Sequence, residues 1–172
     1  SIANWLKRAT IDTCIFNLET SYDNSTDKKK AFLHVFWNEF NGKRGFNKFN
    51  ITMAQHLEKP LADKGVFEAF KKRIAEEEGD WNDPGMAADM IDNELSLVLD
   101  IAAELAPSLD KESIRERIIK RDTNMSIERF GGELAAYLKD KGDDYRLILL
   151  ADEVSQFINK ERDRYLNLQE II

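Results

Sequence analysis

Residues 145–153 have the sequence YRLILLADE, in which an apolar run ends in two carboxylates. The five consecutive apolar residues at 147–151 are typical of a strand in a parallel sheet that is buried on both faces. A turn-like sequence, KGDD at 141–144, precedes the run. At the carboxyl end of such a strand, Asp152 and Glu153 would lie at the edge of the sheet where α/β proteins bind their ligands.

Asp152 and Glu153 form the pattern that nucleotide hydrolysis requires. Asp152 would hold Mg²⁺ through water, and Glu153 would orient or deprotonate the attacking water. Mg²⁺ needs only one or two protein carboxylates, because phosphates and waters complete its octahedron. The same pattern also fits a buried strand that ends in two solvated acids. The sequence contains no Gly-x-x-x-x-Gly-Lys-Ser/Thr loop, so this chain alone is not expected to bind ATP well.

A second strand is predicted at residues 10–18 (TIDTCIFNL), which mix β-branched and aromatic residues in a run too short for a helix. Asn17 lies at its carboxyl end. The prediction is one partial domain over residues 1–172, mainly α with a small parallel β component. Its segments are a strand at 10–18, a helical insertion at 27–140, the strand at 145–153 and a helix at 154–172.

The helical insertion is predicted from apolar residues at helical spacing and from capping signals. Asn50, Asp83 and Ser126 are suitable N-caps, and Pro60 is expected to restrict the helix that Asn50 begins. Gly131 and Gly132 weaken the last helix by about 1 kcal/mol each relative to Ala. Helices are predicted at 27–41, 50–57, 66–77, 86–106, 111–120 and 126–139. The aromatic residues expected in the core are Phe32, Phe36, Trp37, Phe40, Phe67 and Phe70.

The predicted sheet is too small to be stable by itself. Two strands are marginal in water, and parallel strands normally have both faces covered. Either the helices cover a very small sheet, or further strands belong to sequence outside this chain. The second interpretation is favoured, and it makes the chain a piece of a larger protein. Unpaired strand edges add homo-oligomerisation as a hypothesis.

The composition fits a folded protein without an extended nucleic-acid-binding face. Hydrophobic residues make up 42% of the chain and charged residues 33%, and the net charge is −7. No apolar run reaches the roughly 18 residues that span a bilayer, so no membrane partner is expected. Cys14 is the only cysteine, which excludes a disulfide framework and favours a reducing cytoplasm. His34 and His56 are the only histidines, and neither has a second ligand at metal-binding spacing.

The remaining charged clusters are expected to be solvated. They are the acidic run Glu76–Glu78 with Asp80, and the basic pairs and runs Lys28–Lys30 and Lys43–Arg44. The basic residues could alternatively contact phosphate.

The run RLILLADEVSQFI, followed about ten residues later by YLNLQEII, resembles the P-loop ATPases of BREX phage-defence systems, known as BrxC. In that family the Walker B strand ends in Asp-Glu-Val-x-Gln-(Phe/Tyr)-Ile and is followed by a Leu-Asn-Leu-Gln helix. Residues 10–23 and 30–46 also look like the family's segment downstream of its Walker A loop. Ser155 stands where many relatives have Gly. The matching residues are Asp152, Glu153, Val154, Gln156, Phe157, Ile158, Leu166, Asn167, Leu168 and Gln169.

The resemblance implies an AAA-like ATPase parent in which Asp152 binds Mg²⁺ through water and Glu153 is catalytic. Mg²⁺ and ATP are expected in the full-length parent, whereas this fragment alone is expected to be inactive and to bind neither. The Walker A, sensor and arginine-finger elements would lie outside the chain. Other BREX defence proteins are the implied partners, with DNA contacted through the parent complex. The alternative is a helical protein–protein interaction module in which the acidic pair has no catalytic role.

Overall fold

The computed structural model describes residues 9–18, 30–158 and 162–171. The structure is mainly helical with a two-stranded parallel sheet, which confirms the predicted fold class. The chain divides into two compact units. The sheet unit comprises the described residues up to Lys43 and those from Met125 onward, and the helical unit comprises residues 44–124. None of the described helices combines the length and the apolar character needed to cross a membrane.

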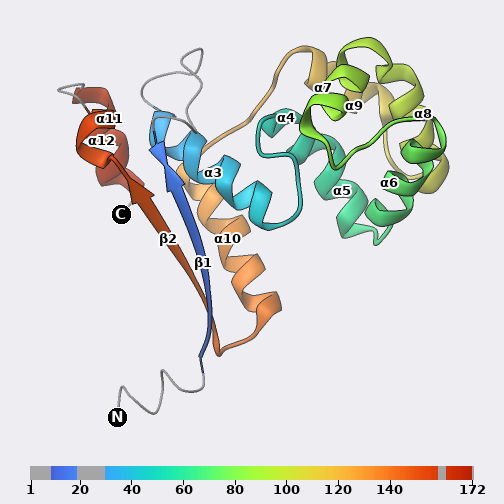
Figure 1. Cartoon of the computed structure of the whole chain (residues 1–172). Helices are drawn as coiled ribbons and strands as arrows, with labels where there is room; N and C mark the ends of the chain where they lie inside the picture. The colour runs from blue at the N-terminus through green and yellow to red at the C-terminus, as the bar shows by residue number, and fades with distance from the viewer. Residues whose placement is uncertain (1–8, 19–29, 159–161, 172) are drawn as a thin grey trace. The chain divides into compact units, whose positions relative to one another are not determined.

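The sheet consists of β1 (Thr10–Asn17) and β2 (Tyr145–Asp152), which run side by side in the same direction (Figure 1). Their register pairs the first residues, Thr10 with Tyr145, and the last, Asn17 with Asp152. Both predicted strands are therefore confirmed, and both end at one edge of the sheet. This shared edge follows from the parallel pairing and equal length of the two strands.

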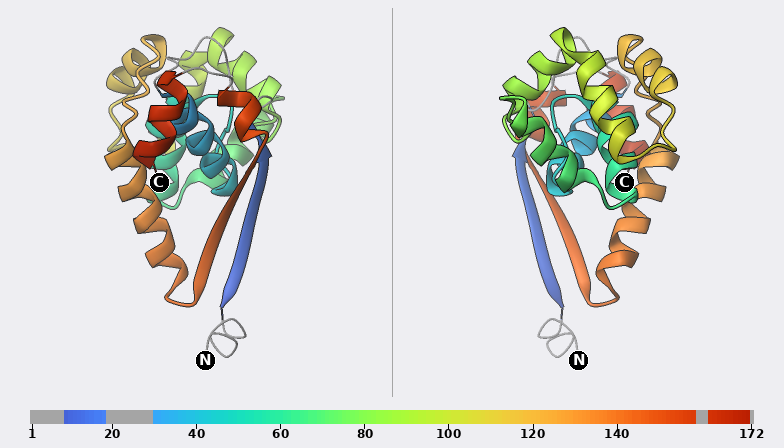
Figure 2. Two further views of the ribbon diagram at one scale, coloured as in Figure 1. Left: turned by 90° about the vertical axis from the view of Figure 1, so that its left-hand side faces the viewer. Right: turned by 90° about the vertical axis from the view of Figure 1, so that its right-hand side faces the viewer.

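One face of the sheet is covered by helices of the same unit, as the two views of Figure 2 show for α3 and α10. Side chains at alternate strand positions point to this face. Phe16 on β1 is one of them, and it is buried in the apolar core between the sheet and these helices. Phe157 packs edge-to-face on Phe32, with ring centroids 5.0 Å apart. The described helices of this unit are α3 (Ala31–Lys43), α10 (Ile127–Lys141), α11 (Val154–Ile158) and α12 (Arg162–Ile171).

No element among the described residues of this unit covers the other face of the sheet, which is called the open face below. Ile15 is 74% exposed, Ile11 and Leu150 are each 48% exposed, and Ile148 is 40% exposed. The prediction that the strand at 145–153 is buried on both faces is therefore wrong for the structure described here. A continuous apolar run indicates that both faces of a strand are suited to burial. The run does not show which element, if any in this chain, covers the second face.

A polar network fixes the amino end of the sheet. Asp12 accepts hydrogen bonds from Lys43 Nζ at 2.5 Å and from the Tyr145 hydroxyl at 2.7 Å. The hydrogen bond from Lys43 lowers the pKa of Asp12, and Asp12 in turn raises the pKa of Lys43. Lys43, for which the sequence predicts a solvated side chain, thus joins the end of α3 to Asp12 on β1, and Asp12 joins it to Tyr145 on β2.

The helical unit has its own apolar core, built from every one of its larger helices. Phe67 and Phe70 lie in this core, as predicted, and Phe70 packs edge-to-face on Trp81 with centroids 4.9 Å apart. Asn50 and Asp83 are N-caps, as predicted. The elements are α4 (Ile51–Met53), the π-helix η2 (Ala54–Glu58), α5 (Lys59–Asp63), α6 (Phe67–Glu76), α7 (Pro84–Asn93), α8 (Leu95–Leu105) and α9 (Lys111–Ile119).

Two predictions for this unit are wrong. Pro60 does not restrict the continuation of the helical segment that Asn50 begins: the chain passes through η2, and Pro60 falls in the first turn of α5. In a regular α-helix the carbonyl of the residue four positions earlier would collide with the proline ring, and here that residue lies in the π-helix η2. The single helix predicted at 86–106 is two helices, because Glu94 leaves helical geometry at φ −127° and ψ 27°. Asp92 and Asn93, which precede it, are poor helix formers.

Candidate functional site at the carboxyl edge of the sheet

The carboxyl edge of the sheet brings together Asn17, Asp152 and Glu153. Asn17 and Asp152 are register partners at the ends of β1 and β2, and Glu153 follows directly. The Asn17 side-chain amide donates to Glu153 Oε2 at 2.5 Å. The two residues are separated by 136 positions in the chain, so the parallel pairing of the strands creates the contact. This edge is the position at which α/β proteins bind ligands.

Glu153 has an unusual backbone conformation for a residue with a side chain. Its φ is +58°, in the left-handed region, which costs a non-glycine residue about 1–3 kcal/mol. Its N–H donates to Asp152 Oδ1 at 2.7 Å, and its carbonyl accepts from Phe157 N at 2.9 Å, in the first turn of α11. The turn at Glu153 therefore directs the chain from β2 into α11. Such strained residues cluster at functional sites.

The two carboxylates differ in their surroundings. Asp152 is exposed, whereas Glu153 is partly buried and held by the amide of Asn17. An exposed carboxylate is suited to binding a hydrated Mg²⁺ ion, and a fixed carboxylate is suited to orienting a water molecule. The described part of the chain offers no group of three or more metal-ligating side chains, so any metal bound at this edge would need ligands from a substrate.

The histidines and the cysteine that the sequence singles out occupy other places. His34 Nδ1 lies 3.2 Å from the side-chain amide of Asn38, one turn away on α3. His56 is buried, and its Nε2 lies 2.7 Å from the carbonyl oxygen of Asp122. Cys14 contacts the carboxylate of Glu39 at 3.9 Å. The described contacts of these three side chains are thus made within the unit to which each belongs.

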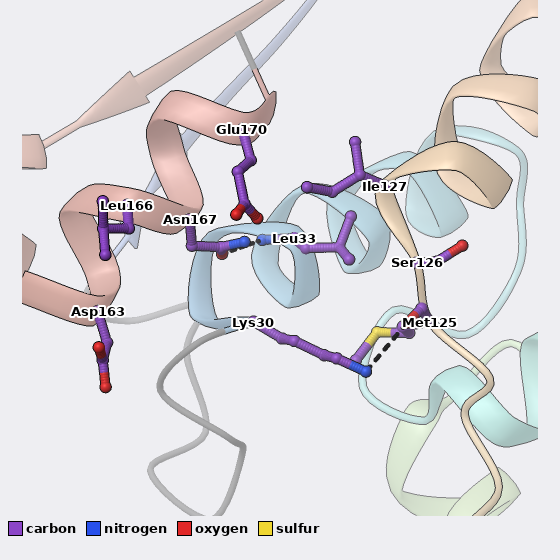
Figure 3. Close-up of a pocket in the computed structure, with 9 residues that line it drawn as sticks. All are labelled: Lys30, Leu33, Met125, Ser126, Ile127, Asp163, Leu166, Asn167 and Glu170. Atoms are coloured by element: carbon purple, nitrogen blue, oxygen red, sulfur yellow. Dashed lines mark hydrogen bonds between the residues drawn. The ribbon is translucent and has the colours of Figure 1, made fainter.

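A separate pocket of about 560 Å³ lies between α3, α12 and the start of α10 (Figure 3). Figure 3 shows the Glu170 side chain extending from α12 toward the start of α3, whereas the Asp163 side chain points away from α3. Lys30 donates to the carbonyl oxygen of Met125 at 3.1 Å. The described lining is Lys30, Leu33, Met125, Ser126, Ile127, Asp163, Leu166, Asn167 and Glu170, which does not include the residues of the carboxyl edge.

Asn167 has a structural role that the sequence does not indicate. The side chain is 3% exposed, and its Oδ1 accepts hydrogen bonds from Phe32 N at 3.0 Å and Leu33 N at 3.2 Å. It thereby caps the start of α3 from another helix, which satisfies two N–H groups that a helix start leaves unpaired. Its only signal in the sequence is its place in the Leu-Asn-Leu-Gln segment of α12.

Glu58 is a second residue that sequence reasoning misses. The side chain is 1% exposed and accepts from Asn47 N at 2.6 Å and from Trp81 Nε1 at 2.8 Å. Burial raises the pKa of Glu58 to about 7, against the lowering effect of these two hydrogen bonds and of the charge on Lys71. The signal in the sequence is weak: one acidic residue close to the apolar residues of 51–61.

Comparisons with known proteins do not assign the chain to a family. No family model matches the sequence, and no solved structure matches the fold significantly. Functional conclusions for this protein therefore depend on the residues and geometry of the carboxyl edge.

Proposed function

We propose that Asp152 and Glu153 form the metal- and water-binding half of a nucleotide-hydrolysing site in a P-loop ATPase of the BREX phage-defence type. The hydrogen bond between Asn17 and Glu153, at the common edge of two parallel strands, is the observation that supports this proposal best. It holds a carboxylate at a fixed position beside the exposed Asp152. The resemblance of residues 146–158 and 165–172 to the BREX ATPases supports the choice of this family.

In this proposal Asp152 binds Mg²⁺ through water, and Glu153 orients or deprotonates the water that attacks the γ-phosphate. ATP would be held mainly by a Walker A loop, which this sequence does not contain. The proposed parent acts in the cytoplasm with other BREX proteins, and its contacts with DNA are made through that complex. The chain described here contributes half of a site.

Substitution of Glu153 in the full-length parent tests the catalytic role. Glu153→Gln keeps the size and shape of the side chain and removes the base, so we expect ATP hydrolysis to fall by at least 100-fold while ATP binding is retained. Glu128→Gln, at an exposed position on α10, is the matched control and should hydrolyse ATP normally. Unchanged turnover in Glu153→Gln would contradict the proposal.

A helical interaction module is the second candidate function, and the independent core of residues 44–124 favours it. A unit with its own core can be carried as an insertion without disturbing the sheet. Replacing residues 44–124 in the parent by a short Gly/Ser linker separates the two functions. If partner binding is lost while ATP hydrolysis stays normal, the helical unit is the binding module. If both partner binding and hydrolysis are retained, the helical unit is not the binding module.

A further inference from the structure

The open face of the sheet carries an exposed apolar patch. The patch, defined as Ile11, Ile15, Ile148 and Leu150, contains side chains that are 40–74% exposed. The register places Ile15 beside Leu150, Ile148 beside Thr13 and Ile11 beside Arg146, so the four side chains share one face of the sheet across both strands. Exposed apolar patches with polar ends are typical of interaction surfaces, and parallel sheets are normally covered on both faces.

Opposite charges mark the two ends of this face. Strand side chains alternate between faces, so the positions of Arg146 and Asp152 share the face of Ile148 and Leu150. The Arg146 guanidinium donates to the carbonyl oxygen of Asp143 at 2.6 Å, which keeps it at the amino end of β2. Asp152 ends the strand and is exposed. The two positions are about 20 Å apart at about 3.3 Å per residue.

We propose that this open face binds the same face of a second copy of the chain, with the twofold axis running across the strands. Such an axis stacks β2 on β2 in opposite directions, because it reverses the strand direction. Arg146 of each copy then lies opposite Asp152 of the other, and Ile148 lies opposite Leu150 between these charge pairs. On β1, Ile15 lies opposite Thr13 and Ile11 opposite Asn17. Stacked sheets pack about 10 Å apart, which is within reach of these side chains.

The charges favour this arrangement over the other twofold axis that brings the two open faces together. An axis parallel to the strands would stack β1 on β2, with Arg146 opposite Ile11 and Asp152 opposite Asn17. That arrangement pairs no opposite charges: the Arg146 guanidinium would leave water with only backbone carbonyls as partners, and Asp152 would face an uncharged amide, which is costly. Two apolar positions of β2 lie between two opposite charges on this face, so β2 is complementary to itself only when the two copies of the strand run in opposite directions.

The small size of the patch sets the strength of the dimer. Four partly exposed side chains cover less area than the roughly 800 Å² per partner of a standard stable interface. We therefore expect a dissociation constant in the micromolar range. This inference goes beyond the proposed function and does not depend on it, but it shares Asp152, so Mg²⁺ binding and dimer formation would compete.

Sedimentation velocity of the full chain, at concentrations from about 10 µM to 1 mM, measures the dimer directly. Ile15→Asp introduces a charge within the patch. We expect it to raise the dissociation constant of the dimer at least tenfold and to leave the circular dichroism spectrum of the chain unchanged. Ile119→Asp is the control, because Ile119 is 66% exposed but lies on α9 in the helical unit. A chain that stays monomeric throughout, or a dimer that Ile15→Asp leaves intact, would overturn the proposal.

A charge exchange tests the direction of the strands. Arg146→Asp alone and Asp152→Lys alone should each weaken the dimer, because each creates two like-charge pairs. In an equimolar mixture, both ends of the heterodimer carry opposite charges, so dimerisation should return to the unmodified level. A dimer that weakens in the single variants but does not recover in the mixture would overturn the proposed geometry.

Discussion

The buried carboxyl group of Glu58 leads to a prediction about the pH dependence of stability. Glu58 belongs to the π-helix η2, and it accepts hydrogen bonds from Asn47 and Trp81 in two separate loops. Lys71 on α6 is the charged group that acts on it most clearly. The side chain is 1% exposed, so its ionised form loses nearly all contact with water on folding.

The magnitude and sign follow from the pKa. Folding raises the pKa of Glu58 from its ordinary 4.5 to about 7, so the folded state holds this proton more tightly than the unfolded state. The contribution to stability is fully present below pH 4.5 and is lost as the pH rises through 7. At 1.36 kcal/mol per pKa unit, the loss between these pH values is about 3 kcal/mol.

Glu58→Gln removes the titration and retains the shape of the side chain. The amide has one acceptor oxygen in place of two, so one of the N–H groups of Asn47 and Trp81 loses its partner, at a cost of about 1–3 kcal/mol at every pH. Relative to the unmodified chain, however, the variant should gain about 3 kcal/mol of stability between pH 4.5 and 8. The predicted quantity is therefore the change with pH in the difference between the free energies of unfolding of the two proteins.

Urea unfolding followed by Trp81 fluorescence provides the assay, with Trp5 and Trp37 changed to Phe in both proteins so that the signal comes from the helical unit. Glu104→Gln, at an exposed position on α8, is the control and should leave the pH dependence unchanged. A stability difference between the Glu58→Gln and unmodified proteins that stays constant from pH 4.5 to 8 would refute the reasoning.

Three further substitutions have expected effects on stability. Gly79→Ala should destabilise the helical unit by about 1–3 kcal/mol, because the new Cβ would lie 2.6 Å from Met90 Sδ, and urea unfolding detects the loss. Gly131→Ala, in open space within α10, should stabilise the sheet unit by about 1 kcal/mol, measured by Trp37 fluorescence. Asn167→Ala should cost the sheet unit about 1–2 kcal/mol in the same assay, because Leu33 N and its neighbour lose their acceptor.

The strands and most helices follow from local patterns in the sequence. The apolar run at 147–151 and the β-branched run at 10–18 both predict strands, and the caps at Asn50, Asp83 and Ser126 fix three helix starts. These signals are local, because a cap or a periodic pattern acts within a few residues. The break at Glu94 and the passage through Pro60 depend instead on packing within the helical unit, and local propensity does not contain that information.

The candidate site shows the same division. Asp152 and Glu153 are apparent from the sequence because an apolar strand ends at them. The hydrogen bond from Asn17 depends on the register of two strands that are far apart in the chain, and the sequence supplies neither the pairing nor the register. The roles of Asn167 and Glu58 are also tertiary, since their partners lie on other elements.

The open face and the carboxyl edge are connected through one residue. Because side chains alternate along β2, the position of Asp152 belongs both to the face of Leu150 and to the edge beside Glu153. An element that covers the face therefore also sets the surroundings of the Asp152 carboxylate. A second copy would bring a cation to it, whereas a nucleotide would bring a hydrated metal ion. The exposure of the apolar patch and the ligand of Asp152 should for this reason change together, since covering the face with one partner excludes the other.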